Sequence, residues 1–484
     1  MKAMLWRGLA GYLPANVVQG IVGLLSVVAF TRLLSPAAYG AYAVAFSAAS
    51  LAHTLTFTWL EAAMARFYAR EAEAGHLEDH FAAIYRTFAG LAAVFLLVAG
   101  LVAWLLPLEP GLKGAVAAGL LCVPLRSLAK LAQEHRRAAG RVRPSALLDI
   151  GQSSGAFVIG AGLAALGMGG AAPLLGAGIA AVACVAFVLT GEIGLAAKGH
   201  SGPARVGEYL RYGLPVSLSL VLSLALATTD RFMLAAFLSP ASVGVYHAGY
   251  SLSNRTLDVL FIWLGAAGGP AAVMALERGG MAALKDTARE QASLMLLICL
   301  PAAAGLALVA HPLAQLLVGE GLRDGAARVT PWIAASGFFA GLTTYYFHTA
   351  FTLGRRTGLL LAAMAVPAGA NLALTWILIP RFGLDGAMWA TTASYAIGTL
   401  ASCAIGRKAI ALPIPWDALL RCGAATAVMA GAVLLVPAMG GVIELFAKAG
   451  AGMAVYGLCA FALDAAGIRS RRRHMVQALQ GAPA

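Results

Sequence analysis

Long apolar runs alternate with short polar connections along almost the whole chain. A helix that crosses a bilayer needs about 20 predominantly apolar residues, and runs of that length occur about fourteen times. The expected spans begin near Leu9, Ala41, Thr87, Leu112, Ser145, Ala172, Glu208, Ser242, Gln291, Val329, Thr357, Asp385, Ala418 and Gly441. If the last two form one re-entrant pair, the count falls to about twelve. The pattern predicts an all-α polytopic membrane protein, because only helices and closed barrels satisfy their backbone groups in lipid.

Composition leads to the same class. Of 484 residues, 60% are hydrophobic and 11% are charged, and the mean hydropathy is +0.81. Soluble domains carry about 25% charged residues, so a soluble fold of this size could not bury so much apolar surface. The six cysteines lie in or beside apolar stretches without a C-x-x-C spacing, which is typical of small buried side chains. Secreted, cytosolic and disordered classes are therefore excluded.

Positive charge follows alternate connections between the expected spans. The net charge is +13, and basic residues cluster in segments such as 130–143 and 469–473. The connections "PLEPG" from Pro107 and "GMGGAAP" from Gly167 contain none. Cytoplasmic loops carry an excess of Lys and Arg, so this alternation predicts an even number of spans with both termini cytoplasmic. It also explains the basic excess without a nucleic-acid partner.

An internal repeat divides the chain. "LSPAAYGAYAVAFSAAS" from Leu34 recurs as "LSPASVGVYHAGYSLSN" from Leu238, and each copy straddles the first connection of a set of six expected spans. Because six is even, both sets enter the membrane with the same orientation. The repeat predicts two parallel six-helix bundles, in residues 1–200 and 201–410, facing a central cavity. Residues 411–466 would add two helices, and residues 467–484 would form a basic cytoplasmic tail.

Three segments carry a family resemblance. "TRLLSPAAYGAY" from Thr31, "DRFMLAAFLSPASVGVY" from Asp230 and "IPRFGLDGAMWATTASY" from Ile379 resemble the recurring signatures of the polysaccharide transporter branch of the MOP superfamily. That branch contains the Wzx-like flippases and is related to the MATE exporters and the lipid II flippase MurJ.

The resemblance implies a multi-pass protein of the bacterial inner membrane that serves lipopolysaccharide or exopolysaccharide synthesis. By alternating access it would move an undecaprenyl-diphosphate-linked oligosaccharide from the cytoplasmic to the periplasmic leaflet. The implied partners are the lipid-linked oligosaccharide, the bilayer, and possible assemblies with a polysaccharide polymerase and glycosyltransferases.

Polar side chains within the apolar runs are the candidate substrate ligands. A diphosphate requires cations and a sugar requires amides or hydroxyls, and ionisable groups at membrane depth usually face the interior. The candidate substrate-binding residues are Arg255, Arg126, Arg32, Arg231, Asn254 and Asn371. Each has a structural alternative. Arg126 would extend toward the interface, Arg255 would pair with Asp258, Arg32 and Arg231 would anchor helix ends, and the asparagines would join helices.

Four carboxylates are candidates for coupling transport to H⁺ or Na⁺, namely Asp258, Asp230, Asp149 and Glu192. The alternative is that they are ordinary solvated carboxylates near helix ends. No nucleotide-binding, metal-ligand or G-x-S-x-G motif occurs in the chain. We therefore expect a transporter rather than an enzyme, with no metal site and no cofactor beyond a coupling ion.

Two other functions remain open. A MATE-like small-molecule exporter would share the fold, but its cavity would favour acidic groups for organic cations. An integral-membrane O-antigen polymerase or ligase would act on the same lipid-linked sugars, but would be expected to carry a large periplasmic loop, which this chain lacks.

Overall fold

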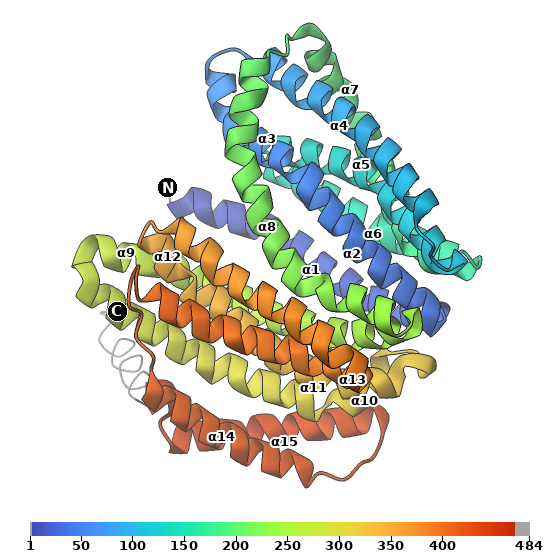
Figure 1. Cartoon of the computed structure of the whole chain (residues 1–484). Helices are drawn as coiled ribbons and strands as arrows, with labels where there is room; N and C mark the ends of the chain where they lie inside the picture. Colours follow the sequence, from blue (N-terminus) through green and yellow to red (C-terminus); the bar gives the residue numbers. More distant parts are fainter. Residues whose placement is uncertain (1, 470–484) are drawn as a thin grey trace. The chain divides into compact units, whose positions relative to one another are not determined.

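The computed structural model describes residues 2–469, except for the side chains of residues 2–13, Phe187 and Arg255. Within that part the chain is helical and has no strand, which confirms the all-α prediction (Figure 1). The long helices are α1 (Lys2–Leu33), α2 (Pro36–Thr56), α3 (Thr58–Glu73), α4 (Leu77–Leu105), α5 (Pro110–Ala138), α6 (Val142–Ala165), α7 (Ala172–Lys198), α8 (Pro203–Phe237), α9 (Pro240–Leu308), α11 (Glu320–Leu342), α13 (Thr357–Gly406), α14 (Trp416–Leu434) and α15 (Gly441–Ala462). Short elements are η1 (Gly169–Ala171), α10 (Ala310–Leu317), η2 (Thr343–Phe347), α12 (Thr349–Leu353) and η3 (Ala465–Gly467).

Membrane-spanning length is common among these helices. In the part of the chain that is described, 10 helices are long and apolar enough to cross a membrane, or up to 11 if α2 and α3, bent by 47°, make one span. Helices α9 and α13 each join two helices at a kink, where Gly280 and Gly383 have φ values of 65° and 59°. Glycine adopts this left-handed conformation without a Cβ clash. Every predicted span start falls within one of the helices of the structure.

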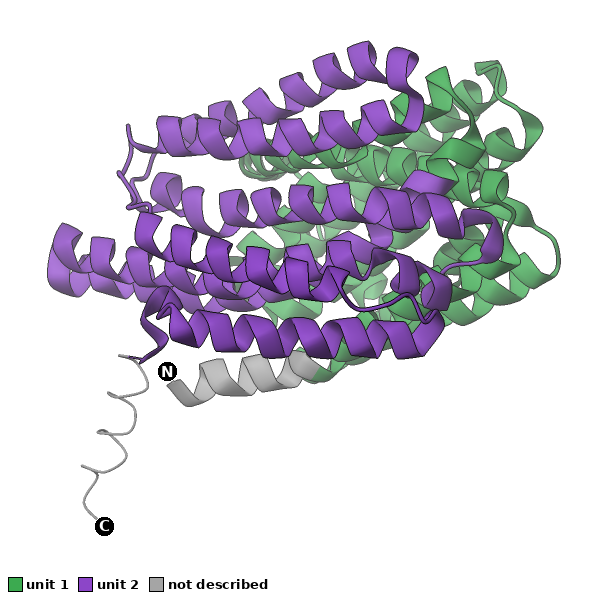
Figure 2. Cartoon of the chain, turned by 90° about the horizontal axis from the view of Figure 1, so that it is seen from below, with its two compact units in different colours: residues 1–244 green, residues 245–484 purple. Residues whose placement is uncertain are grey.

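The chain divides into two compact units, shown in separate colours in Figure 2. Unit 1 is Met1–Gly244 and unit 2 is Val245–Ala484, so the division falls inside α9. Helix α8 packs against α2 and α3 and belongs to unit 1. The domain boundaries expected from the repeat, near residues 200 and 410, stay a prediction.

In unit 1 the main packing partners are α6 with α7, α2 with α5, α1 with α6, and α5 with α7. The apolar core includes Phe57, Met64 and Ile84, all with no exposed surface. Phe57 also caps the bend between α2 and α3, and its ring packs 5.4 Å from that of Phe88 on α4. The bend is thus held by the core rather than by a loop.

The two copies of the sequence repeat touch each other within unit 1. A Cβ on Gly40 would lie 1.7 Å from the carbonyl oxygen of Pro240, and a Cβ on Gly244 would lie 2.2 Å from that of Pro36. These four residues are the equivalent prolines and glycines of the two copies. The contact is therefore reciprocal, and at both glycines the helices approach more closely than a side chain allows.

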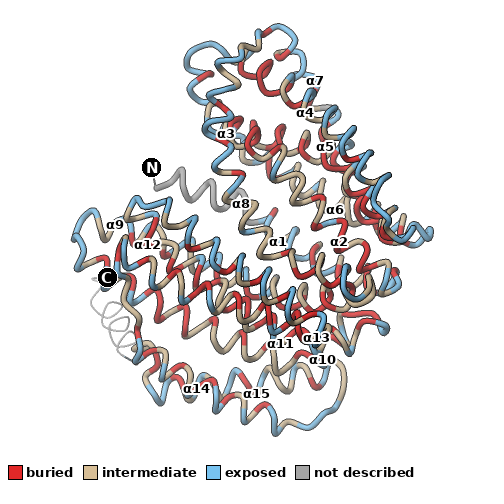
Figure 3. The backbone as a smooth tube through the Cα atoms, in the orientation of Figure 1, coloured by how far each residue is buried: buried red, intermediate tan, exposed pale blue. Residues whose placement is uncertain are grey.

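In unit 2, α11 packs against α13, and α15 packs against α14 and α10. Figure 3 shows buried residues on the inner faces of the helices and exposed residues on the outer ones. Large apolar side chains stand outward on the hairpin of α14 and α15, and Leu434, Phe446 and Met453 are more than two thirds exposed. Such a surface suits contact with lipid tails, not water.

Candidate functional site

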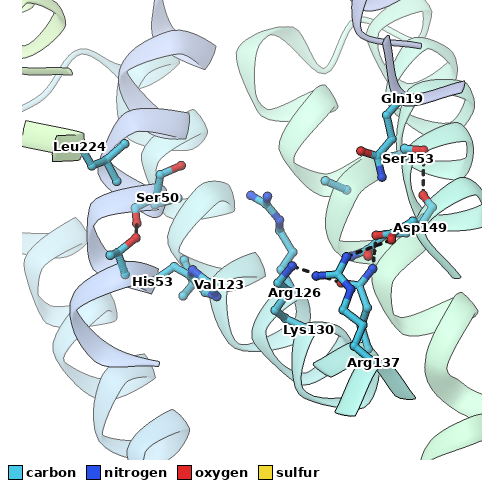
Figure 4. A pocket seen from close by; sticks show the side chains of 16 residues that line it. Gln19, Ser50, His53, Val123, Arg126, Lys130, Arg137, Asp149, Ser153 and Leu224 are labelled. Carbon is cyan, nitrogen blue, oxygen red and sulfur yellow. Dashed lines mark hydrogen bonds and ion pairs between the residues drawn. The ribbon is translucent and has the colours of Figure 1, made fainter. Parts of the chain in front are cut away.

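Unit 1 contains a cavity of about 620 Å³. It is formed by α1, α2, α5, α6, α7 and α8, and Figure 4 shows its wall at close range. The polar and charged side chains that line it are Gln19, Ser50, His53, Thr54, Arg126, Lys130, Gln133, Arg137, Asp149, Gln152 and Ser153.

Helical periodicity brings these side chains to one place. Helix α5 contributes Arg126, Lys130, Gln133 and Arg137, together with Val123. These positions are three or four residues apart, so they share one face of the helix. The same spacing was visible in the sequence as a polar stripe through an amphipathic segment. The prediction named Arg126 alone from this stripe and missed Lys130, Gln133 and Arg137.

Most of the charge in the cavity is compensated locally. The Arg137 guanidinium lies 2.9 Å from Glu134 Oε1 and 3.1 Å from Asp149 Oδ2. Lys130 Nζ lies 3.4 Å from Glu134 Oε1, and the Gln133 amide donates a hydrogen bond to Asp149. Asp149 thus lines the cavity as an ion-pair partner of Arg137. Its proposed role in ion coupling stays a prediction.

Arg126 is the exception. Among the described residues its guanidinium has no hydrogen bond and no ion pair, although it is largely withdrawn from solvent. The guanidinium lies over an aromatic face, since its Cζ is 5.8 Å from the ring centroid of Phe46. In Figure 4 the side chain projects into the open space between Ser50 and His53 on one side and Asp149 and Ser153 on the other. An uncompensated cation at this depth is costly unless an anion joins it.

A buried carboxylate that the sequence analysis overlooked supports the opposite wall. Glu61 is 5% exposed, and its Oε1 lies 2.8 Å from His53 Nε2 and accepts a hydrogen bond of 3.1 Å from Ser127 Oγ. His53 and Glu61 flank the bend between α2 and α3, so the pair joins the two helices across it. The signal in the sequence was a single glutamate inside the apolar run "FTWLEAAM".

The remaining candidates of unit 1 are not among the residues lining this cavity. Arg32 is exposed on α1 and its Nη1 donates to the Val28 carbonyl at 3.0 Å. Arg231 is buried in α8 and its Nη1 donates to the Ala227 carbonyl at 2.8 Å. Asp230 is also buried, and its side chain accepts from the Arg231 backbone N–H at 2.9 Å. These three bonds are to groups of the same helix, and the predicted roles of Arg32, Arg231 and Asp230 stay predictions.

Glu192 belongs to a buried polar cluster away from the cavity wall. It is 3% exposed and accepts hydrogen bonds from Tyr85, from His135 at 2.8 Å and from Arg136 at 2.9 Å. The alternative of a solvated carboxylate at a helix end is therefore wrong, because side chains of α4 and α5 bond to Glu192 and leave it almost without exposed surface.

The candidates of unit 2 lie on α9 and α13. Asn254 donates to Asp258 at 2.6 Å, whereas the side chain of Arg255, the expected partner of Asp258, lies outside the described residues. Asn371 is fully buried in α13, and neither of its amide atoms has a hydrogen-bond partner in the described part of the chain. Among all the described residues, no group of three or more His, Cys, Asp or Glu side chains lies close enough together to hold a metal ion.

The comparisons with known proteins concern the family and the fold of the chain. Residues 29–324 match a family model described as polysaccharide biosynthesis protein. No curated protein matches the chain. Among solved structures, the lipid II flippase MurJ in an inward closed conformation superposes with a TM-score of 0.76 at 13% identity, covering 94% of this chain and 98% of MurJ.

Two transporter structures are also similar. An inward-facing multidrug resistance MATE family transporter of the MOP superfamily gives a TM-score of 0.67 at 14% identity, covering 81% of this chain and 94% of the transporter. A MOP superfamily transporter from Pyrococcus furiosus, described as having a binding pocket of reverse polarity, gives 0.52 at 15% identity, with coverages of 84% and 94%. At such identities the likeness shows the fold. The chain belongs to the polysaccharide biosynthesis protein family and has the fold of the MOP superfamily transporters.

Proposed function

We propose that this chain is a flippase that moves an undecaprenyl-diphosphate-linked oligosaccharide from the cytoplasmic to the periplasmic leaflet of the bacterial inner membrane. Movement would proceed by alternating access of the substrate site, with both termini in the cytoplasm. Glycosyltransferases would supply the substrate, and a polysaccharide polymerase would consume it. The chain itself would act as a transporter, not an enzyme.

The observation that carries this proposal is the uncompensated guanidinium of Arg126 in the cavity of unit 1. Lys130 and Arg137 have carboxylate partners, but Arg126 has none within 4.0 Å among the described residues. A guanidinium binds a phosphate through two parallel hydrogen bonds, and this interaction strengthens as water is excluded. The diphosphate of a lipid-linked sugar is an anion of this kind.

The rest of the cavity wall suits a glycan. Gln19, Gln152, Ser50, Thr54 and Ser153 place amides and hydroxyls around the open space. Such groups exchange hydrogen bonds with sugar hydroxyls in several orientations. A cavity that favoured organic cations would present carboxylates instead, and Asp149, its lining carboxylate, is already bonded to Arg137. The charge of the wall therefore favours the flippase over a MATE-like exporter.

Reconstitution into liposomes tests the proposal. Wild-type protein should move a fluorescent undecaprenyl-diphosphate oligosaccharide between leaflets without changing its mass. Arg126→Ala should slow this movement by at least about tenfold, because a hydrogen bond to a charged group contributes ~1.5–3 kcal/mol. Arg126→Lys should lie between the two, since an ammonium keeps the charge but loses the bidentate geometry. Arg143→Ala, at an exposed position in the first turn of α6, is the matched control.

Three outcomes would contradict the proposal. Lengthening or cleavage of the glycan would indicate a polymerase or ligase. Transport of small organic cations without the lipid would indicate an exporter. Equal rates for Arg126→Ala and wild type would remove the observation on which the proposal depends. An imposed pH or Na⁺ gradient would then show whether H⁺ or Na⁺ drives the cycle, and Asp258, Asp230, Asp149 and Glu192 remain the candidate coupling residues.

A further inference from the structure

A second, smaller cavity of about 120 Å³ lies beside the first in unit 1. The two share Arg126, Ser153, Ala156 and Ala177, so they meet along these residues. We call this smaller cavity the annex. Any group bound in the annex would be a direct neighbour of an anion bound by Arg126.

The wall of the annex differs from that of the main cavity because it is aromatic. It is lined by Phe30 of α1, Tyr42 and Phe46 of α2, and Phe157 of α6. The Phe30 centroid lies 6.1 Å from that of Tyr42 and 6.3 Å from that of Phe157, and the Tyr42 centroid lies 6.0 Å from that of Phe46. The rings therefore form one continuous cluster across three helices.

The packing behind the cluster holds it in place. Phe30 is 4% exposed, and Gly160 on α6 leaves the space for its ring, since a Cβ there would lie 3.2 Å from Phe30 Cζ. Phe46 and Phe157 are less buried than Phe30 and reach toward the open volume. A rigid aromatic surface beside a polar chamber binds ligands at a low cost in conformational entropy.

The chemistry of the wall indicates its ligand. The face of an aromatic ring is electron-rich and attracts the partly positive C–H bonds of a sugar ring, while sugar hydroxyls turn to polar neighbours. Ser26 and Ser153 provide hydroxyl oxygens in the same wall. An isoprene unit would gain from the rings but would leave these oxygens and the adjacent polar chamber unused.

We propose that the annex is a subsite for the sugar attached directly to the diphosphate, with Arg126 binding the neighbouring phosphate. This inference rests on the proposed flippase function and adds to it the part of the substrate that the protein would distinguish. The remaining sugars would occupy the larger polar cavity. Selectivity would then arise at the first sugar, whereas Arg126 would bind every lipid diphosphate.

Two lipid ligands separate the annex from the phosphate site. The first is undecaprenyl diphosphate, and the second is the same lipid carrying a single hexose. Affinity of the purified full chain for each is measured in nanodiscs. Wild type should bind the hexose-bearing lipid more tightly than the bare one.

Variants of the aromatic residues then show which part of the ligand the annex binds. Phe157→Leu should weaken binding of the hexose-bearing lipid by about two- to tenfold and leave the bare lipid unchanged, because aromatic contacts contribute beyond simple burial. Phe46→Leu should also weaken the binding of the hexose-bearing lipid more than that of the bare lipid. Arg126→Ala should weaken the binding of both lipids. Phe446→Leu, an exposed phenylalanine on α15, controls for loss of an aromatic side chain without loss of the annex.

The outcomes that overturn the inference are distinct. Equal weakening of both lipids by Phe157→Leu would mean that the rings hold the isoprenoid or Arg126 instead of the sugar. No change for either lipid in both phenylalanine variants would mean that the annex is not a subsite. If wild type binds neither lipid, the flippase proposal itself fails, and with it this inference.

Discussion

Buried charge has two different uses among the residues of unit 1. Glu192 is enclosed by groups that donate to it, including His135 and Arg136, so its charge is compensated within the protein. Arg126 has no such partner among the described residues and faces a cavity. The first arrangement stabilises the fold, whereas the second leaves binding capacity for a ligand. In the sequence both are charged residues within apolar segments, and only the contacts in the structure distinguish their roles.

The Glu192 cluster leads to a stability prediction. Glu192→Gln should lower the free energy of unfolding by ~3–5 kcal/mol, because it leaves the buried guanidinium of Arg136 without a counter-ion. The measurement is thermal unfolding of the purified protein in detergent. Glu320→Gln, at an exposed position, is the control and should change little. Unfolding at the same temperature for both variants would show that the Glu192 cluster does not stabilise the chain.

At the scale of elements, the positions of glycine decide how closely helices approach. Helix α2 meets the start of α9 at Gly40 and Gly244, where no side chain fits. Helix α1 carries Gly20 with no atom within 4 Å of its Cβ position. The chain therefore contains glycines at which helices meet and glycines that have open space around them.

This contrast can be measured. Gly40→Ala should destabilise the protein by ~1–3 kcal/mol, because its methyl group would meet the backbone of Pro240, which cannot rotate away. Gly20→Ala should be neutral or slightly stabilising, since alanine is the better helix former and open space surrounds it. Both are compared by thermal unfolding in detergent. Loss of stability in Gly20→Ala but not in Gly40→Ala would contradict the packing at the repeat.

At the scale of the whole molecule, the topology stays a prediction that one helix can test. Arg143 is exposed in the first turn of α6 and Met168 is exposed in the connection that follows its last residue, and α6 is long enough to cross a bilayer. The distribution of basic residues predicts that Arg143 is cytoplasmic and Met168 periplasmic.

Cysteine labelling decides the orientation. In intact cells, Arg143→Cys should resist a membrane-impermeant thiol reagent, whereas Met168→Cys should react. Permeabilised cells should label both, and the parent chain controls for the natural cysteines, three of which are buried. Labelling in the opposite sense would invert the topology and place the basic loops outside.

The sequence by itself determined the class of fold and the identity of the spans. Each span is a local property, since about 20 apolar residues in one run must form a helix in lipid whatever surrounds them. The same reasoning explains why the repeat at Leu34 and Leu238 and the family signatures were readable without coordinates. Arg126 was singled out as a candidate in the same way, because an arginine inside an apolar run stands out against its neighbours.

The tertiary structure alone decided which polar residues meet. Asp149 pairs with Arg137 on the preceding helix, and Glu192 meets Arg136 across more than fifty residues of chain. Glu61 reaches Ser127 on α5, and the aromatic wall of the annex combines α1, α2 and α6. Hydropathy indicates how deep in the membrane a residue lies, but it does not show which residues of a neighbouring helix the side chain contacts. Whether a buried charge is compensated or available to a ligand depends on that pairing, which only helix packing fixes.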